Sequence, residues 1–366
     1  MTRRSAPTPF LDFIAGSKDR SLDSADTSST LTDRLPPETL PSVFNVSLRG
    51  WPSEEEADAR ELGGGVLALA KSISRRLDLS RLEAIVIAMN YEEALASLER
   101  GEGIAPTVPT SNEYGQGGAM SCLVVRDDEP WSVVVIWAPL LRQILDPEHP
   151  DHGFALMLLV HELVHVDDLR LLGGTFPGGW RAARARDGRE QELLPLVHPC
   201  ASEYSAQRRS AWLVPEHGLQ LLEMLGEAMV EVDDQIRSER RRYRLHGDMQ
   251  TFWPVVVRRL TFLFQALGYG LGHADWVAHE AEEHPELAKR YSDKLEELER
   301  LPTGWLIEVC REGVQPYMKL KAWEDLSVYD PLIAILEKLL NGYGMFTRIN
   351  GDGMYVDMPL TGLHAL

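Results

Sequence analysis

Apolar positions along the chain predict a mixture of helices and strands in about the first 215 residues. Leu82–Met89 is apolar except for Glu83 and has the length of a buried strand, and the pattern of Tyr91–Arg100 is helical. Two more apolar runs, Cys122–Arg126 and Ser132–Trp137, flank an Asp-Asp-Glu-Pro sequence, which predicts a β-hairpin. Strands joined by a helix and then by a hairpin favour an α+β fold over a doubly wound one.

The distribution of residue types divides the chain into three predicted segments. Residues 1–53 are rich in Ser, Thr, Asp and Pro, which predicts a flexible N-terminal arm. Residues 54–215 begin with a helical pattern, Glu54–Leu79, that three consecutive glycines interrupt, and they contain the predicted strands. Residues 216–366 carry further helical patterns, the last over Tyr317–Leu340, and end in a predicted hairpin around an Asn-Gly-Asp-Gly turn.

One predicted helix is far more apolar than the others. It begins after Asp151, whose side chain can cap the first backbone N–H groups, and a glycine pair at 173 and 174 is expected to end it. Leucines and valines occupy nearly all of its faces, which is typical of a buried helix. The stretch from 173 to 199 is then expected to be an irregular link, either a flap over a site or disordered.

The apolar helix contains the sequence His-Glu-Leu-Val-His at 161–165. His161 and His165 lie one helical turn apart, so both imidazoles can reach one metal ion, and Glu162 lies beside them. The alternative is that the histidines bond to backbone carbonyls and Glu162 pairs with an arginine. Because burying all three groups is costly without a partner, the buried helix favours a zinc site.

A catalytic zinc site needs a third protein ligand and an open position for water. Glu203 is the strongest candidate, in the first turn of a second helix expected after Pro199, and His198 is the runner-up. The small Ala206 would let this helix approach the first one closely. The alternative for Glu203 is an ordinary carboxylate near a helix N-terminus. Asp168 is better placed to accept the N–H of a ligand imidazole than to bind the metal.

The motifs His-Glu-Leu-Val-His at 161–165 and Glu-Tyr-Ser-Ala at 203–206 resemble those of gluzincin metallopeptidases, in particular the compact ImmA/IrrE-like type. The resemblance covers about residues 60–215. It implies a zincin-like core, with a small mixed sheet and an active-site helix, in which Ser132–Trp137 or its neighbouring strand pairs with an extended substrate. It also implies zinc bound by His161, His165 and Glu203, and hydrolysis of peptide bonds with Glu162 as general base.

One residue departs from the gluzincin pattern. Relatives often carry Asp or Asn one turn after the ligand Glu, where it orients a metal-binding histidine, but this chain has Gln207. An amide oxygen can still accept an imidazole N–H, so Gln207 is expected to keep the geometry while making the histidine less basic. For the hydrogen bond to a developing oxyanion, Tyr204, Tyr114 and His198 remain open as donors.

Composition narrows the classes of partner and compartment. The net charge of −19 over 366 residues argues against a general affinity for nucleic acid or acidic lipid. Three scattered cysteines predict buried free thiols in a reducing compartment. With no apolar run of membrane-spanning or signal-peptide length, we expect a cytoplasmic protein that does not enter a membrane.

Three hypotheses for the function follow from these observations. The first is a cytoplasmic zinc metallopeptidase that acts on a protein or peptide substrate. The second is a catalytically weak or inactive zincin-like interaction or regulatory module, in which zinc is structural. The third is a helical protein without metal. The oligomeric state is not indicated by any of these patterns.

Overall fold

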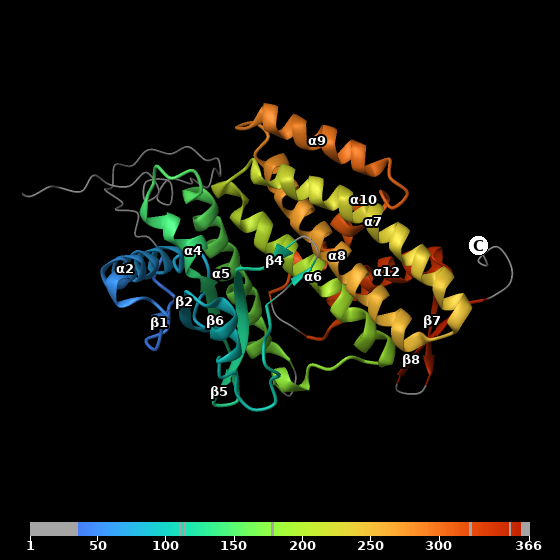
Figure 1. Ribbon diagram of the computed structural model, residues 1–366, viewed down its shortest axis with the longest axis horizontal. Coiled ribbons are helices and arrows are strands. Elements are labelled where there is room, and N and C mark those ends of the chain that lie inside the picture. Colours follow the sequence, from blue (N-terminus) through green and yellow to red (C-terminus); the bar gives the residue numbers. More distant parts are fainter. Residues whose placement is uncertain are drawn as a thin grey trace, which may run out of the picture.

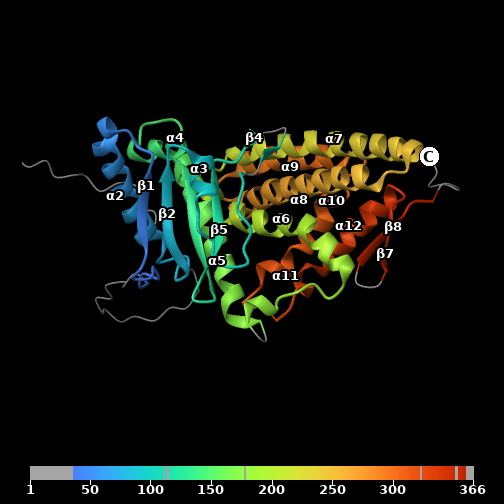
Figure 2. The ribbon, with the colours of Figure 1, turned by 60° about the horizontal axis from the view of Figure 1, so that its bottom comes forward.

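The computed structural model describes residues 36–109, 111–112, 115–176, 179–321, 324–350 and 353–359. A small mixed sheet with its covering helices forms one end of an elongated molecule, and a set of packed helices forms the other (Figures 1 and 2). The two parts meet where helix α5 (His152–Thr175) packs against helix α6 (Gly188–Ser210). This arrangement confirms the predicted α+β class.

The sheet has four strands in the order β1–β2–β6–β5, bounded as β1 (Asn45–Arg49), β2 (Leu82–Ala88), β6 (Glu129–Trp137) and β5 (Ala119–Arg126). The first three strands run parallel to one another, and β5 pairs antiparallel with β6 as an outer strand. The predicted hairpin is confirmed, but its turn is only Asp127-Asp128, both with positive φ, as a two-residue type I′ turn requires.

Alternate side chains of β2 serve the two faces of the sheet. Ile85 and Ile87 pack with α5 and with α2 (Glu56–Ile73) on one face, and Val86 packs with α3 (Tyr91–Ala96) on the other. The expectation that three glycines interrupt α2 is wrong. Gly63 faces the Leu48 side chain of β1, so the cost of helical glycine is offset where the helix packs closely on the sheet.

Strand β1 lies inside the segment predicted to be a flexible arm. It pairs with β2 over its whole length, and the Thr39 hydroxyl ahead of it donates to the backbone carbonyls of Ser74 and Leu77 at 2.7 and 2.9 Å. Apolar Val46 and Leu48 alternate with polar residues in this strand, but the prediction missed it because the pattern is only five residues long and follows a Ser- and Pro-rich stretch.

The second half of the molecule is helical, as predicted. Its long helices are α7 (His217–His246), α8 (Met249–His279), α9 (Pro285–Glu299) and α12 (Asp330–Gly342). Shorter α-helices in the described residues, besides α3, are α4 (Ala138–Leu141), α10 (Leu306–Gly313) and α11 (Gln315–Met318). The remaining strands are β3 (Ser111–Asn112), β4 (Gly115–Gln116), β7 (Phe346–Asn350) and β8 (Gly353–Asp357).

The closing hairpin of β7 and β8 confirms the prediction, whereas the single helix expected over Tyr317–Leu340 is wrong. That segment is divided between α11 and α12, each of which has a proline in its first turn. The three cysteines are buried free thiols, as predicted. Among the described residues, no helix combines the length and apolar character needed to cross a bilayer.

Two boundaries around the predicted metal site also differ from expectation. Helix α5 continues through the glycine pair to Thr175, and α6 begins at Gly188 rather than after Pro199, so the expected irregular link is much shorter. The Asp187 side chain accepts from the Glu190 N–H at 2.8 Å and so starts α6 early. Two prolines then lie inside α6, where burial against α5 and α8 outweighs their lost backbone hydrogen bonds.

Candidate metal centre

Helix α5 carries the His-Glu-Leu-Val-His sequence with its apolar side against the sheet. Leu159, Leu163 and Val166 are fully buried there, as the pattern predicts, and the two histidines face α6. Asp151 does precede the first residue of α5, but its side chain makes no capping hydrogen bond, so that part of the prediction is wrong. The helix is held in place by burial of its apolar side chains rather than by its cap.

Three ligand atoms from the two helices converge on one point. Nε2 of His161 lies 3.2 Å from Nε2 of His165, and the Oε2 atom of Glu203 lies 3.1 and 3.4 Å from these nitrogens. In a tetrahedral site with metal–ligand bonds of about 2.0–2.1 Å, neighbouring ligand atoms are about 3.3 Å apart. The three side chains therefore have the spacing that a single metal ion requires, and they could hold one.

The donor atoms of this triad are poorly satisfied by the protein itself. Glu203 Oε2 and His161 Nδ1 are buried and find no hydrogen-bond partner of suitable geometry among the described residues, although Glu203 Oε1 accepts from Gln265 Nε2 at 3.3 Å. Buried polar atoms normally have partners, so an oxygen left free beside two imidazole nitrogens fits a cation. Two nitrogens and one carboxylate oxygen are a set that suits divalent transition metals.

The electrostatics of the triad also favour a cation. Burial alone would lower the pKa of His165, but the Glu203 carboxylate overcomes this effect and raises that pKa to about 9. In return, and despite its own burial, Glu203 is kept ionised because His165 and His161 hold its pKa well below the usual range. The carboxylate thus draws positive charge to the point where the imidazoles meet.

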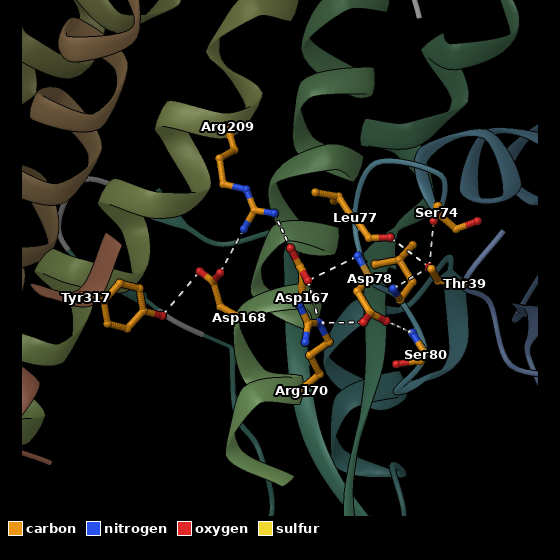
Figure 3. A network of polar contacts seen from close by, with 11 residues as sticks. Thr39, Ser74, Leu77, Asp78, Ser80, Asp167, Asp168, Arg170, Arg209 and Tyr317 are labelled. Atoms are coloured by element: carbon orange, nitrogen blue, oxygen red, sulfur yellow. Dashed lines mark hydrogen bonds and ion pairs between the residues drawn. The ribbon is translucent and has the colours of Figure 1, made fainter. Parts of the chain in front are cut away.

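The groups that orient the histidines are not those predicted from the sequence. Ser202 Oγ lies 3.1 Å from Nδ1 of His165, whereas Asp168 accepts from Arg209 and Tyr317 at 2.9 and 3.4 Å (Figure 3). Asp168 was expected to hold a ligand imidazole, but its short side chain lies among these other donors. That prediction is wrong.

Gln207 likewise does not contact a metal-ligand histidine. Its Oε1 atom lies 3.3 Å from Nδ1 of His273, a buried residue of α8. The departure at this position therefore leaves the orientation of His161 and His165 unaffected, because neither ring depends on the amide.

Glu162 lies beside the triad and against the outer strand of the sheet. Its side chain is only 6% exposed, and its carboxylate accepts from the backbone N–H of Ser121 in β5. Burial raises the pKa of Glu162, while the two neighbouring imidazoles act in the opposite direction. A fixed carboxylate with a raised pKa is suited to taking and returning a proton.

A cavity of about 730 Å³ lies over these groups. Its wall is formed by β5, α5, α6, α8 and the region around α11, and its polar lining includes His161, Glu162, His165, His198, Glu203, Gln265 and Tyr269. His198 borders the cavity with its ring 5.6 Å from that of Tyr329, but it is not one of the three convergent ligands. Its place as an alternative ligand is therefore not supported.

The predicted oxyanion donors have different outcomes. The prediction of Tyr204 is wrong, because this residue is fully buried and its hydroxyl donates to Asp275 at 2.6 Å. Tyr114 lies outside the described residues, and His198 remains on the cavity wall. Tyr269, which the sequence did not suggest, lies with its ring 6.2 Å from that of His161, and its hydroxyl contacts the Glu203 carboxylate.

Gln265 and Tyr269 reach the site because α8 packs very closely on α6. A Cβ atom on Gly268 would lie 2.6 Å from the Cys200 carbonyl oxygen, and one on Gly272 would overlap that of Tyr204. Glycine at both positions lets the two backbones touch. Gly268 and Gly272, one helical turn apart, are thus the sequence signal for this contact, which joins the metal centre to the C-terminal segment.

Comparison with known proteins returns no match: no family model fits the chain, and no curated protein or solved structure is similar to it. The resemblance to gluzincins therefore rests on two short sequence motifs alone. What the residues can do has to be judged from their own geometry.

Proposed function

We propose that this protein is a zinc-dependent metallopeptidase that hydrolyses peptide bonds in a protein or peptide substrate. The observation that carries the proposal is the buried triangle of His161, His165 and Glu203 with Glu162 beside it, open to a cavity of about 730 Å³. A purely structural metal site is normally closed by a fourth protein ligand. Among the described residues only three ligands converge, and the Glu162 carboxylate lies next to them.

The chain's own groups account for the proton movements of the reaction. Zinc held by the triad would polarise a water molecule and the substrate carbonyl. Glu162, fixed by the Ser121 N–H, takes a proton as the water oxygen attacks the carbonyl carbon. It then gives the proton to the leaving amine as the C–N bond breaks. Gln265 holds the second oxygen of Glu203, and Tyr269 also contacts this carboxylate, so both residues keep the ligand in its position.

The outer strand β5 supplies a place for the substrate backbone. Its N–H and C=O groups alternate in direction, and those of Ser121, Leu123 and Val125 face away from β6, as their contacts with Glu162 and Arg100 show. Ala119 shares this orientation and can pair with an extended peptide. The predicted strand Ser132–Trp137 cannot pair with a peptide, because it belongs to β6, which is central in the sheet. Its neighbour β5 therefore pairs with the substrate.

Metal analysis and one conservative substitution test the proposal. Purified wild type should contain about one zinc per chain by elemental analysis, and His161→Ala should contain almost none. Glu162→Gln should keep zinc but lose cleavage of a complex peptide mixture followed by mass spectrometry. Equal and negligible zinc in wild type and His161→Ala would reject the metal site.

The second hypothesis, a regulatory module with structural zinc, makes the same metal prediction. It differs in predicting that wild type and Glu162→Gln leave the peptide mixture equally intact. The position of Glu162 at the cavity, rather than in an ion pair with an arginine, favours the enzyme.

A further inference from the structure

Arg100 brings a guanidinium group to the wall of the metal-centre cavity, at the free edge of β5. Its Nε donates to the Leu123 carbonyl at 2.9 Å, and its Nη1 donates to the Ala105 carbonyl at 2.6 Å. Leu123 is two residues along the strand from Ser121, whose N–H holds Glu162. Since a strand advances about 3.3 Å per residue, the two contacts on β5 are about 7 Å apart.

The charge of Arg100 is not balanced by a carboxylate within contact. Both partners of its guanidinium are neutral carbonyl oxygens, and in the part of the chain that the structure describes no acid forms an ion pair with it. A guanidinium has five N–H donors, so donors remain after two contacts. Asp168 also lines the cavity, but its carboxylate is already paired with Arg209 and does not balance the charge of Arg100.

Arg100 and Glu162 act on the same small region of the site. Burial raises the pKa of the Cys122 thiol to about 11, and the opposite charges of Arg100 and Glu162 are both close enough to affect it. Cys122 lies between the two β5 residues that these side chains contact. The cavity wall therefore carries the positive charge of Arg100 near Glu162, and their contacts on the edge of β5 are two residues apart.

The chain around Arg100 also closes the edge of β5. The Val125 N–H donates to the Arg100 carbonyl at 2.8 Å, and Gly101 follows with a positive φ of 89°. A Cβ atom on Gly101 would lie 2.7 Å from the Val125 carbonyl oxygen, so this segment is pressed against the strand. An extended peptide that pairs with β5 at Ala119 therefore cannot continue along the strand edge past Arg100, which occupies the Leu123 carbonyl.

We propose that Arg100 binds a carboxylate of the substrate about 7 Å, or two residues, from the bond that is cleaved. This inference rests on the proposed peptidase function and names its substrate class: peptides with an acidic side chain, or a free C-terminus, at that distance. Both sources present the same pair of oxygens, which a guanidinium recognises through charge-assisted hydrogen bonds. The closed strand edge places that carboxylate at the end of the paired segment.

Three hydroxamate probes of equal length test the inference by isothermal titration calorimetry on the zinc-loaded full-length protein. Each carries the metal-binding hydroxamate two residues from a variable group: an Asn amide, an Asp side chain with an amidated C-terminus, or a free C-terminal carboxylate. Wild type should bind one carboxylate probe roughly ten- to hundredfold more tightly than the Asn probe, the range expected for a hydrogen bond to a charged group. The probe that gains affinity identifies the source of the carboxylate.

Substitutions assign the preference to Arg100. Arg100→Gln keeps an amide donor but removes the charge, and it should bind all three probes with the wild-type affinity for the Asn probe. Arg100→Lys should keep part of the preference. Arg126→Gln is the matched control, because it removes a guanidinium from the end of the same strand that does not line the cavity; it should leave the preference intact.

The outcomes separate this inference from the function on which it rests. Hydroxamate binding by wild type with no preference among the probes would overturn the role of Arg100 and leave the metal site standing. A preference that survives in Arg100→Gln, with the thermal unfolding of that variant unchanged, would also overturn it. If the zinc-loaded wild type binds none of the probes, both the open metal site and the inference are rejected.

Discussion

The hydroxyl oxygen of Ser202 lies 3.1 Å from Nδ1 of His165. When Nε2 of this ring binds a metal ion, its proton must reside on Nδ1, so His165 donates and Ser202 accepts. The contact fixes both the tautomer and the orientation of the ring. Within the part of the chain that the structure describes, no comparable partner holds Nδ1 of His161, so we expect His165 to be the more rigid of the two ligands.

Ser202→Ala should therefore weaken metal binding by about tenfold, the lower end of the effect typical of groups that orient metal ligands. Competition with a chelating dye would measure the affinity for zinc. Ser202→Thr keeps the hydroxyl and should retain most of the affinity. Ser210→Ala is the control, because this buried hydroxyl of the same helix bonds only to backbone carbonyls. Equal affinities in wild type and Ser202→Ala would contradict the orienting role.

The metal ligands could be predicted from the sequence, because the common direction of two of them depends only on local helix geometry. His161 and His165 are four residues apart on a helix whose apolar pattern is clear, so their common direction follows from the helical repeat alone. Glu203 came from a looser motif and does join them. Its helix was nevertheless mispredicted, since two internal prolines gave a local signal that burial overrides.

The residues that support the metal ligands could not be predicted from the sequence. Ser202, Gln265 and Tyr269 have no spacing relative to the first motif that a local pattern could reveal, and they are brought in by the packing of α6 and α8. Tertiary packing, rather than local propensity, places these groups. Strand β1 was missed for another reason: its alternating Val46 and Leu48 form too short a pattern to stand out from the Ser- and Pro-rich stretch before it.

The contact of α8 with α6 can be tested at one of its glycines. Gly272→Ala places a methyl group against the Tyr204 backbone, which cannot move easily, and should destabilise the protein by about 1–3 kcal/mol while lowering zinc affinity. Gly64→Ala is the matched control: it also lies inside a helix, but nothing is near its Cβ position. That variant should be neutral or up to about 1 kcal/mol more stable. Chemical denaturation would compare them, and an unaffected Gly272→Ala protein would contradict the close packing.

A network of ion pairs ties the metal-binding helix to its neighbours (Figure 3). Arg209 of α6 bridges the two adjacent acids of α5, Asp167 and Asp168, whose side chains are 11% and 15% exposed. Asp167 also accepts from the backbone N–H of Asp78 at 3.2 Å, at the turn before β2. Because the acids are largely buried, losing Arg209 leaves the Asp168 carboxylate without a cation, while Asp167 keeps only its ion pair with Arg170 at 2.8 Å.

Arg209→Ala should accordingly reduce the free energy of unfolding by about 2–4 kcal/mol, somewhat less than for a fully buried pair because Arg209 is 29% exposed. Arg60→Ala removes an arginine from an exposed pair with Glu56 and should cost less than about 0.5 kcal/mol. Urea unfolding of the two variants measures the contrast. Similar, small losses for both would show that Arg209 does not stabilise the junction of the helices.

His273 makes the stability depend on pH below neutrality. It is fully buried, its Nε2 lies 3.1 Å from the Pro215 carbonyl, and burial together with the nearby His217 lowers its pKa to about 4. In the unfolded chain its pKa returns to about 6.5, so between these values the unfolded state binds more protons. The contribution is intact above pH 6.5 and is lost as the pH falls towards 4, by about 3 kcal/mol in total. With zinc chelated in both proteins, His273→Gln should unfold with a flatter pH dependence than wild type over this window. Parallel curves would mean that His273 is already protonated in the folded state.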